Sequence, residues 1–106
     1  MDYEELFELL RNEKRSFELT HIEFDLKELL NPDIINIDQK KNYIKMAREV
    51  ISRRITKISE LALNAHIVTI DPTEEMIERE ADLYHYICQG LKDYNKNLGD
   101  ENVKKN

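Results

Sequence analysis

The first hydrophobic positions recur with a helical period. Successive residues of an α-helix are rotated by about 100°, so apolar residues three or four positions apart share a face. Asp2 and Glu5 form a D-x-x-E capping pattern directly before this periodic run. The pattern predicts a first helix over residues 2–17, whose apolar face holds Tyr3, Leu6, Phe7, Leu10 and Phe17.

A short second helix is predicted around Leu26, Leu29 and Leu30. It ends at Asn31-Pro32, because the residue before a proline is disfavoured in the α region.

A long third helix is predicted over residues 38–65. Most of its apolar residues fall together on the helical wheel, with Tyr43, Val50 and Leu61 extending the arc. Arg53 points outward, whereas Arg54 falls inside the apolar arc. The centre of the arc holds Ile44, Ala47, Ile51, Ile55, Ile58, Ala62 and Ala65, and the opposite face holds Lys41, Lys45, Arg48 and Ser52.

A fourth helix is predicted from Pro72 to Leu98. Asp71 is its expected N-cap, and Gly99 its expected C-terminal stop. The prediction divides the chain into a helical domain over residues 1–98 and a polar, disordered tail or start of a linker over residues 99–106. One residue on the apolar face of this last helix, Glu80, is charged.

These elements predict an all-α, four-helix bundle-like domain with two long antiparallel C-terminal helices, because helices joined by a short link pack antiparallel. In that register Arg54 lies one turn from Glu80, so we expect the two to form a buried or half-buried ion pair. Glu18, Glu23 or Asp25 are additional or alternative acceptors. In the alternative interpretation, Arg54 lays its aliphatic stem on the core and keeps its charge in water.

The composition of the chain excludes several classes of protein. The 106 residues fit one domain, and 16 basic against 22 acidic residues give a net charge of −6. This charge argues against more than a little direct nucleic-acid binding, which depends on phosphate neutralisation. The single cysteine, Cys88, excludes an intrachain disulfide. With no long apolar run and no signal segment before the first helix, we expect a cytoplasmic protein without a membrane span.

The candidate chemistry is sparse, and we expect no enzyme, cofactor or metal. Glu78, Asp82 and His85 share an outer face of the last helix, which makes a metal-binding helical enzyme the weakest alternative. Metal sites in helical bundles take ligands from several facing helices, so a solvated face is the simpler interpretation.

Two surface features are candidates for contact with a partner. The basic residues Lys41, Lys45 and Arg48 suit an acidic protein partner or a solvated face better than phosphates, given the acidity of the chain. Tyr86 lies beside the main apolar arc, where an aromatic side chain is either a partner-facing anchor or a singly exposed tyrosine.

Three segments together resemble the helical A domain of the GINS family, most closely its archaeal subunits. They are "YEELFELLRNEKRS" followed by "ELTHIEF", the long helix "YIKMAREVISRRITKISELAL", in which arginines precede "KI" and "LAL", and "TEEMIEREADLYHYICQGLKDY". The resemblance covers residues 2–98, and Arg54 matches an arginine that helps to fix the helical core in such domains.

The resemblance implies a non-catalytic subunit of a DNA replication complex. GINS subunits assemble with paralogous GINS subunits, as homo- or hetero-oligomers, and join the MCM helicase to a Cdc- or RecJ-like partner. A generic helical adaptor or dimerisation domain, associating through its long helices, is the alternative from another class.

Overall fold

The computed structural model describes residues 1–32, 36–65 and 71–105. Within these ranges the chain is all-helical and forms no strand. The three α-helices are α1 (Tyr3–Arg15), α2 (Ile37–Leu63) and α3 (Glu78–Lys105), and two short 3-10 helices are η1 (Leu26–Glu28) and η2 (Pro72–Glu75). The all-α class is therefore confirmed, but the four-helix bundle is not, because the predicted second helix is only the 3-10 turn η1.

Polar side chains define where the helices begin. The Asp2 carboxylate accepts a hydrogen bond from the Glu5 amide at 2.8 Å and caps α1, as the sequence predicts. The Asn36 side chain accepts from the amides of Asp38 and Gln39 and caps α2. Asp71 caps the 3-10 helix η2 and not a long helix.

The last helix differs from its prediction at both ends. The chain leaves the helical conformation at Met76, where φ is −106° and ψ is 144°, and α3 begins only at Glu78. At the other end α3 continues through Gly99. A glycine ends a helix by adopting a left-handed conformation, and neither glycine of this chain has a positive φ. Gly99 therefore does not end α3 as predicted, and the division of the chain into residues 1–98 and 99–106 stays a prediction.

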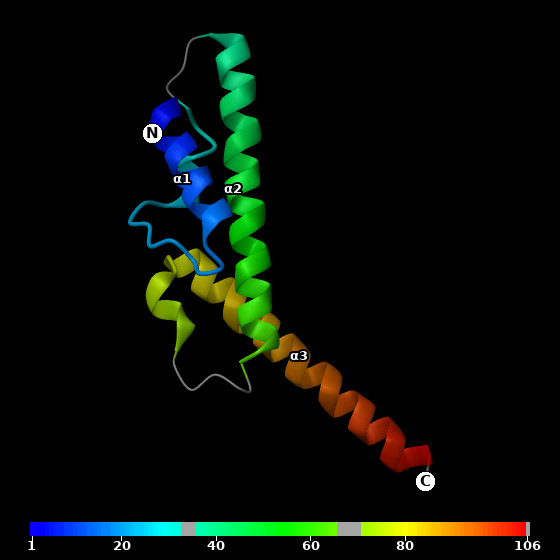
Figure 1. The fold of residues 1–106 in the computed structure, drawn as a ribbon. Coiled ribbons are helices and arrows are strands. Elements are labelled where there is room, and N and C mark those ends of the chain that lie inside the picture. The colour runs from blue at the N-terminus through cyan, green and yellow to red at the C-terminus, as the bar shows by residue number, and fades with distance from the viewer. Residues whose placement is uncertain (33–35, 66–70, 106) are drawn as a thin grey trace.

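Helix α2 is the central element, and the other two helices pack at different levels along it (Figure 1). The first apolar cluster joins α1 and η1 to the N-terminal half of α2, and the second joins α3 to its C-terminal part. The buried members of the first are Leu6, Leu9, Leu10, Ile22, Leu26, Leu29, Tyr43, Ala47 and Val50; those of the second are Ile58, Ala62 and Tyr84.

The predicted antiparallel packing of the two long helices is not confirmed. Arg54 contacts Glu80, and further along both helices Ala62 packs with Tyr84, so residue numbers rise in the same direction on both sides of the contact. Figure 1 shows α3 crossing α2 obliquely in this sense. The antiparallel expectation assumes a short link, whereas α2 ends at Leu63 and α3 begins only at Glu78, so the connection does not impose that arrangement.

The chain is elongated because the C-terminal half of α3 projects from the rest (Figure 1). Its radius of gyration is 17.8 Å, whereas a compact chain of this length would have about 13 Å. Apolar side chains on the projecting half are exposed, with Tyr94 at 62% and Leu98 at 43%. No helix in the described part of the chain combines the length and the apolar character needed to cross a membrane.

Tyr43 provides a test of the first cluster. Its side chain is fully buried, and its hydroxyl has no hydrogen-bond partner among the described residues. Because an unsatisfied buried polar group costs about 1–3 kcal/mol, we expect Tyr43→Phe to raise the free energy of unfolding by about 1 kcal/mol. Urea denaturation measures this change. The control is Tyr86→Phe, at a tyrosine that is 79% exposed and should leave stability unchanged. A destabilised Tyr43→Phe variant would contradict the buried, unpaired hydroxyl.

Candidate protein-interaction site

Helix α2 has a buried face and a face that lines an open groove, and the structure divides its residues between them differently from the helical wheel. Its buried residues are Tyr43, Ala47, Val50, Arg54, Lys57, Ile58 and Ala62. Three isoleucines expected at the centre of the buried arc, Ile44, Ile51 and Ile55, instead lie at its edge and line an open groove. Arg54 therefore lies near the centre of the buried face, and Lys57 lies at the edge away from these isoleucines.

The Arg54 side chain is fully buried and holds Glu80 through two parallel hydrogen bonds. Its Nε donates to Oε2 of Glu80 at 2.6 Å, and its Nη2 donates to Oε1 at 2.7 Å. This is the bidentate geometry in which a guanidinium and a carboxylate interact most strongly. The two residues that the sequence analysis pairs are thus in contact, and Arg54 does not extend its charge into water.

Glu80 also organises the start of α3. The backbone amide of Ile77 donates to Oε1 of Glu80 at 3.3 Å, while the carbonyl of Ile77 accepts from the Ala81 amide. A carboxylate that reaches back in this way satisfies an amide that the first helical turn leaves without a partner. The same side chain therefore both ties α3 to α2 and begins α3.

Sequence reasoning missed two members of this network. Nη1 of Arg54 donates to Oε1 of Glu13 at 2.6 Å and to the carbonyl of Thr20 at 2.6 Å. Lys57 in turn donates to the carboxylate and the carbonyl of Glu13 and to the carbonyl of Glu18. We call Glu13, Arg54, Lys57 and Glu80 the buried charge network.

A signal for the missed residues was present in the pattern. Glu13 follows Leu6, Leu9 and Leu10 at helical spacing, and Lys57 follows Arg54 by three positions. The other expected acceptors lie elsewhere: the Glu23 carboxylate contacts His21, and the Asp25 carboxylate contacts Arg79.

The charges of the network balance, since two cations meet two carboxylates. Burial alone would lower the pKa of Arg54, but the hydrogen bonds and negative charges of Glu80 and Glu13 outweigh it and raise the pKa above its ordinary value. The guanidinium therefore stays charged at any pH at which the protein folds. The arginine is wholly buried and Glu13 is 1% exposed, so the network stabilises the fold and is not placed to meet a substrate.

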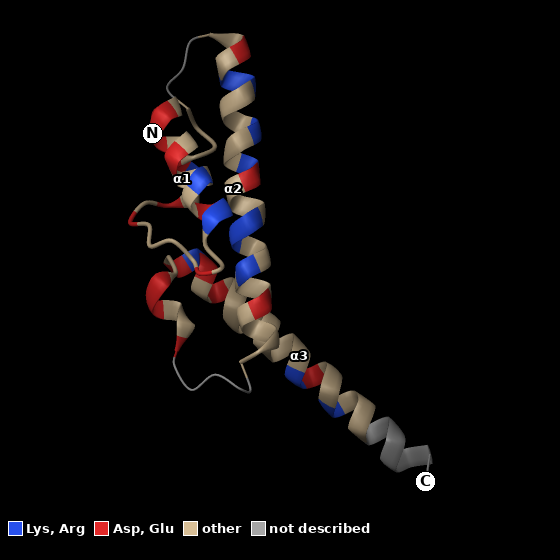
Figure 2. Cartoon of the chain, viewed as in Figure 1, with Lys and Arg blue, Asp and Glu red and all other residues tan. Residues whose placement is uncertain are grey.

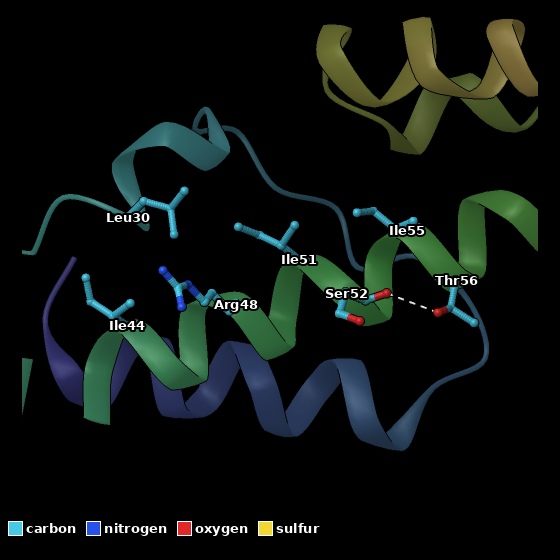
Figure 3. A pocket seen from close by; sticks show the side chains of 7 residues that line it. All are labelled: Leu30, Ile44, Arg48, Ile51, Ser52, Ile55 and Thr56. Atoms are coloured by element: carbon cyan, nitrogen blue, oxygen red, sulfur yellow. Dashed lines mark hydrogen bonds between the residues drawn. The ribbon is translucent and has the colours of Figure 1, made fainter. Parts of the chain in front are cut away.

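An open groove runs along the side of α2, next to its buried face. Figure 3 shows Leu30 facing Ile44 and Ile51 across it, with Arg48 between them and Ile55 further along the helix. A second hollow shares Ile44 and Arg48 with the first and continues toward the N-terminus of α2. We call the two together the α2 groove; it is lined by Leu30, Ile37, Lys40, Lys41, Ile44, Lys45, Arg48, Ile51, Ser52, Ile55 and Thr56.

The structure brings together three of the four candidate partner-facing residues. Lys41, Lys45 and Arg48 are exposed and line the α2 groove. Tyr86 is 79% exposed but belongs to α3 and does not line it.

The outer face of α3 offers no metal centre in the described part of the chain. No three His, Cys, Asp or Glu side chains there gather closely enough to hold an ion. Glu78 and Asp82 line one shallow hollow with Arg79, and His85 lines another with Tyr84 and Cys88.

Comparison of the chain with protein-family models, with curated proteins and with solved structures finds no match. A function therefore has to be inferred from the fold class and from the geometry of the two faces of α2.

Substitution of two neighbouring arginines on α2, one buried and one exposed, tests the buried charge network. Arg54→Met leaves two buried carboxylates without their shared cation and should lower the free energy of unfolding by about 3–5 kcal/mol. Arg53→Met should cost less than about 1 kcal/mol, because Arg53 is exposed and contacts Glu49 at the surface. Chemical denaturation of both variants measures the difference.

The coupling between Arg54 and Glu80 is measured with two further variants, Glu80→Gln and the double variant Arg54→Met, Glu80→Gln. We expect the double variant to lose less stability than the sum of the two single losses, since both remove the same interaction. Additive losses would mean that the two side chains do not act as a pair.

Proposed function

We propose that the chain is a non-catalytic helical subunit of a GINS-like DNA replication complex. In this role it contacts a paralogous GINS subunit and bridges the MCM helicase and a Cdc- or RecJ-like protein through protein–protein contacts. Its surfaces, and not an active site, carry the function.

The observation that carries the proposal is the composition of the buried charge network. Each segment that resembles the family contributes to it: Glu13 comes from the first helix, Arg54 and Lys57 from the run "RRITKI", and Glu80 from the last helix. The "ELTHIEF" segment adds the carbonyl oxygens of Glu18 and Thr20. Arg54, which matches an arginine of the family's helical core, is thus the residue that joins the three segments in this fold, which supports a shared helical core.

The shape of the chain supports assembly with other subunits. Its own helices leave apolar residues of the projecting part of α3 exposed, including Tyr94 and Leu98, as well as Leu63 at the end of α2. An exposed apolar stripe on a helix is stabilised when another helix covers it. We propose that helices of neighbouring subunits complete a four-helix arrangement there.

The same exposed helix also suits the alternative, a generic adaptor that dimerises through α3. The two functions differ in the partner, since the adaptor needs only a second copy of itself.

Co-expression with a paralogous GINS subunit from the same organism tests the proposal. We expect a stable hetero-oligomer by light scattering, and its tagged form should retain the MCM helicase on an affinity column. Leu98→Glu should weaken the assembly without unfolding the chain, because a charge on the exposed stripe opposes its burial in an interface. Lys96→Glu, at an exposed position of the same helix, is the matched control.

A homodimer that forms whether or not the paralogue is present, and that does not retain MCM, would replace the proposal by the adaptor. A chain that remains monomeric in every mixture would contradict both.

A further inference from the structure

Basic residues are concentrated on α2. This helix carries seven of the 16 basic residues of the chain and only three of its 22 acidic residues. Two of the seven, Arg54 and Lys57, belong to the buried charge network, which leaves five basic residues of α2 at the surface. Figure 2 shows blue recurring along α2, whereas α1 is red toward its start and blue toward its end, and the loop after α1 and the turn before α3 are mainly red. A protein of net charge −6 thus presents one positively charged helix.

The α2 groove has the geometry of a helix-binding surface. Its lining residues on α2 follow one another at alternating steps of four and three, which keeps them in one stripe along the helix axis. From Ile37 to Ile55 this stripe is about 27 Å long, or five helical turns. The members in order are Ile37, Lys41, Ile44, Arg48, Ile51 and Ile55.

The floor of the groove is apolar and incompletely covered. Ile37 is 70% exposed, Ile55 is 44% exposed, and Leu30 on the facing loop is 46% exposed. Exposed apolar groups gathered in a groove and rimmed by polar residues indicate an interaction surface.

The rim of the groove carries one sign of charge. Lys40, Lys41, Lys45 and Arg48 line it, and no carboxylate does. None of the four forms an ion pair with another described residue, whereas Arg53, on the same helix, contacts Glu49 at 3.2 Å. The rim is therefore complementary to a negatively charged partner.

We propose that the α2 groove binds an acidic amphipathic helix of a partner protein. Apolar side chains of that helix, spaced at i, i+3 or i+4, and i+7, pack on Ile44, Ile51 and Ile55. Aspartate or glutamate residues beside this stripe pair with Lys41, Lys45 and Arg48. The inference concerns the chemistry of the partner and holds whether or not the chain belongs to a replication complex.

Nucleic acid is a poorer fit to the same groove. Phosphates would use the cations of the rim but would leave the isoleucine floor in water, and the net charge of the chain opposes their approach. An amphipathic helix satisfies the rim and the floor together.

The probe for a test is a labelled synthetic peptide of about 20 residues, matched to the length of the groove. It has leucines at heptad spacing and glutamates on both sides of the leucine stripe. Two control peptides replace every glutamate by lysine or scramble the order of the same residues. Fluorescence anisotropy is expected to show the acidic amphipathic peptide binding at least about tenfold more tightly than either control.

Charge reversal locates the binding to the groove. The triple variant Lys41→Glu, Lys45→Glu, Arg48→Glu should bind the acidic peptide about tenfold or more weakly and should instead prefer the lysine peptide. The matched control reverses Arg11, Lys92 and Lys96 to glutamate, which changes the net charge equally away from the groove. Circular dichroism establishes that both variants keep the helical fold.

Equal binding of the acidic peptide by both triple variants, or no preference over the scrambled peptide, would overturn the proposal. Tighter binding of a short DNA duplex than of the acidic peptide, lost in the groove variant, would overturn it in favour of a nucleic-acid surface.

Discussion

The Arg54 guanidinium, held between the carboxylates of Glu80 and Glu13, is the interaction on which the arrangement of the helices depends. It lies on α2 between the two apolar clusters, with Val50 in one and Ile58 in the other. Apolar packing alone tolerates sliding and rotation, whereas a bidentate ion pair is satisfied only in one geometry. The buried charge network therefore joins α1, α2, α3 and the loop after α1 in a single register.

The network is stable because few of its polar groups are left unsatisfied. All three hydrogens of the Lys57 ammonium have oxygen acceptors, and Arg54 uses its two carboxylate partners together with the carbonyl of Thr20. Removing such groups from water is costly, and their attraction offsets that cost only when the geometry and hydrogen bonding are complete. Glu80 adds a local role, because it also accepts the amide of Ile77 at the start of α3.

Rigid packing on one face of α2 leaves its other face available for a partner. The 27 residues of this helix carry the buried charge network inward and the α2 groove outward. Because α1 and α3 are held against the inner face, the isoleucine floor and the basic rim of the outer face are presented on a fixed scaffold. This arrangement is compatible with the interaction subunit proposed above.

Much of the local structure follows from the sequence alone. Helical periodicity located α1 and α2, Asp2 was recognised as the cap of α1, and the position of Arg54 and Glu80 on apolar faces indicated a buried pair. The pair was inferred from an antiparallel register, yet it forms between helices that run in the same sense, because a chain link sets a distance and not a direction. The apolar arc of α2 is also wider than its buried face, so periodicity could not choose between the face bearing Tyr43 and Arg54 and the face bearing Ile51. The contacts of Glu13 and Lys57 and the course of α3 past Gly99 likewise became visible only in three dimensions. Local pattern determines which segments are helices, whereas contacts between distant segments decide which face each helix buries.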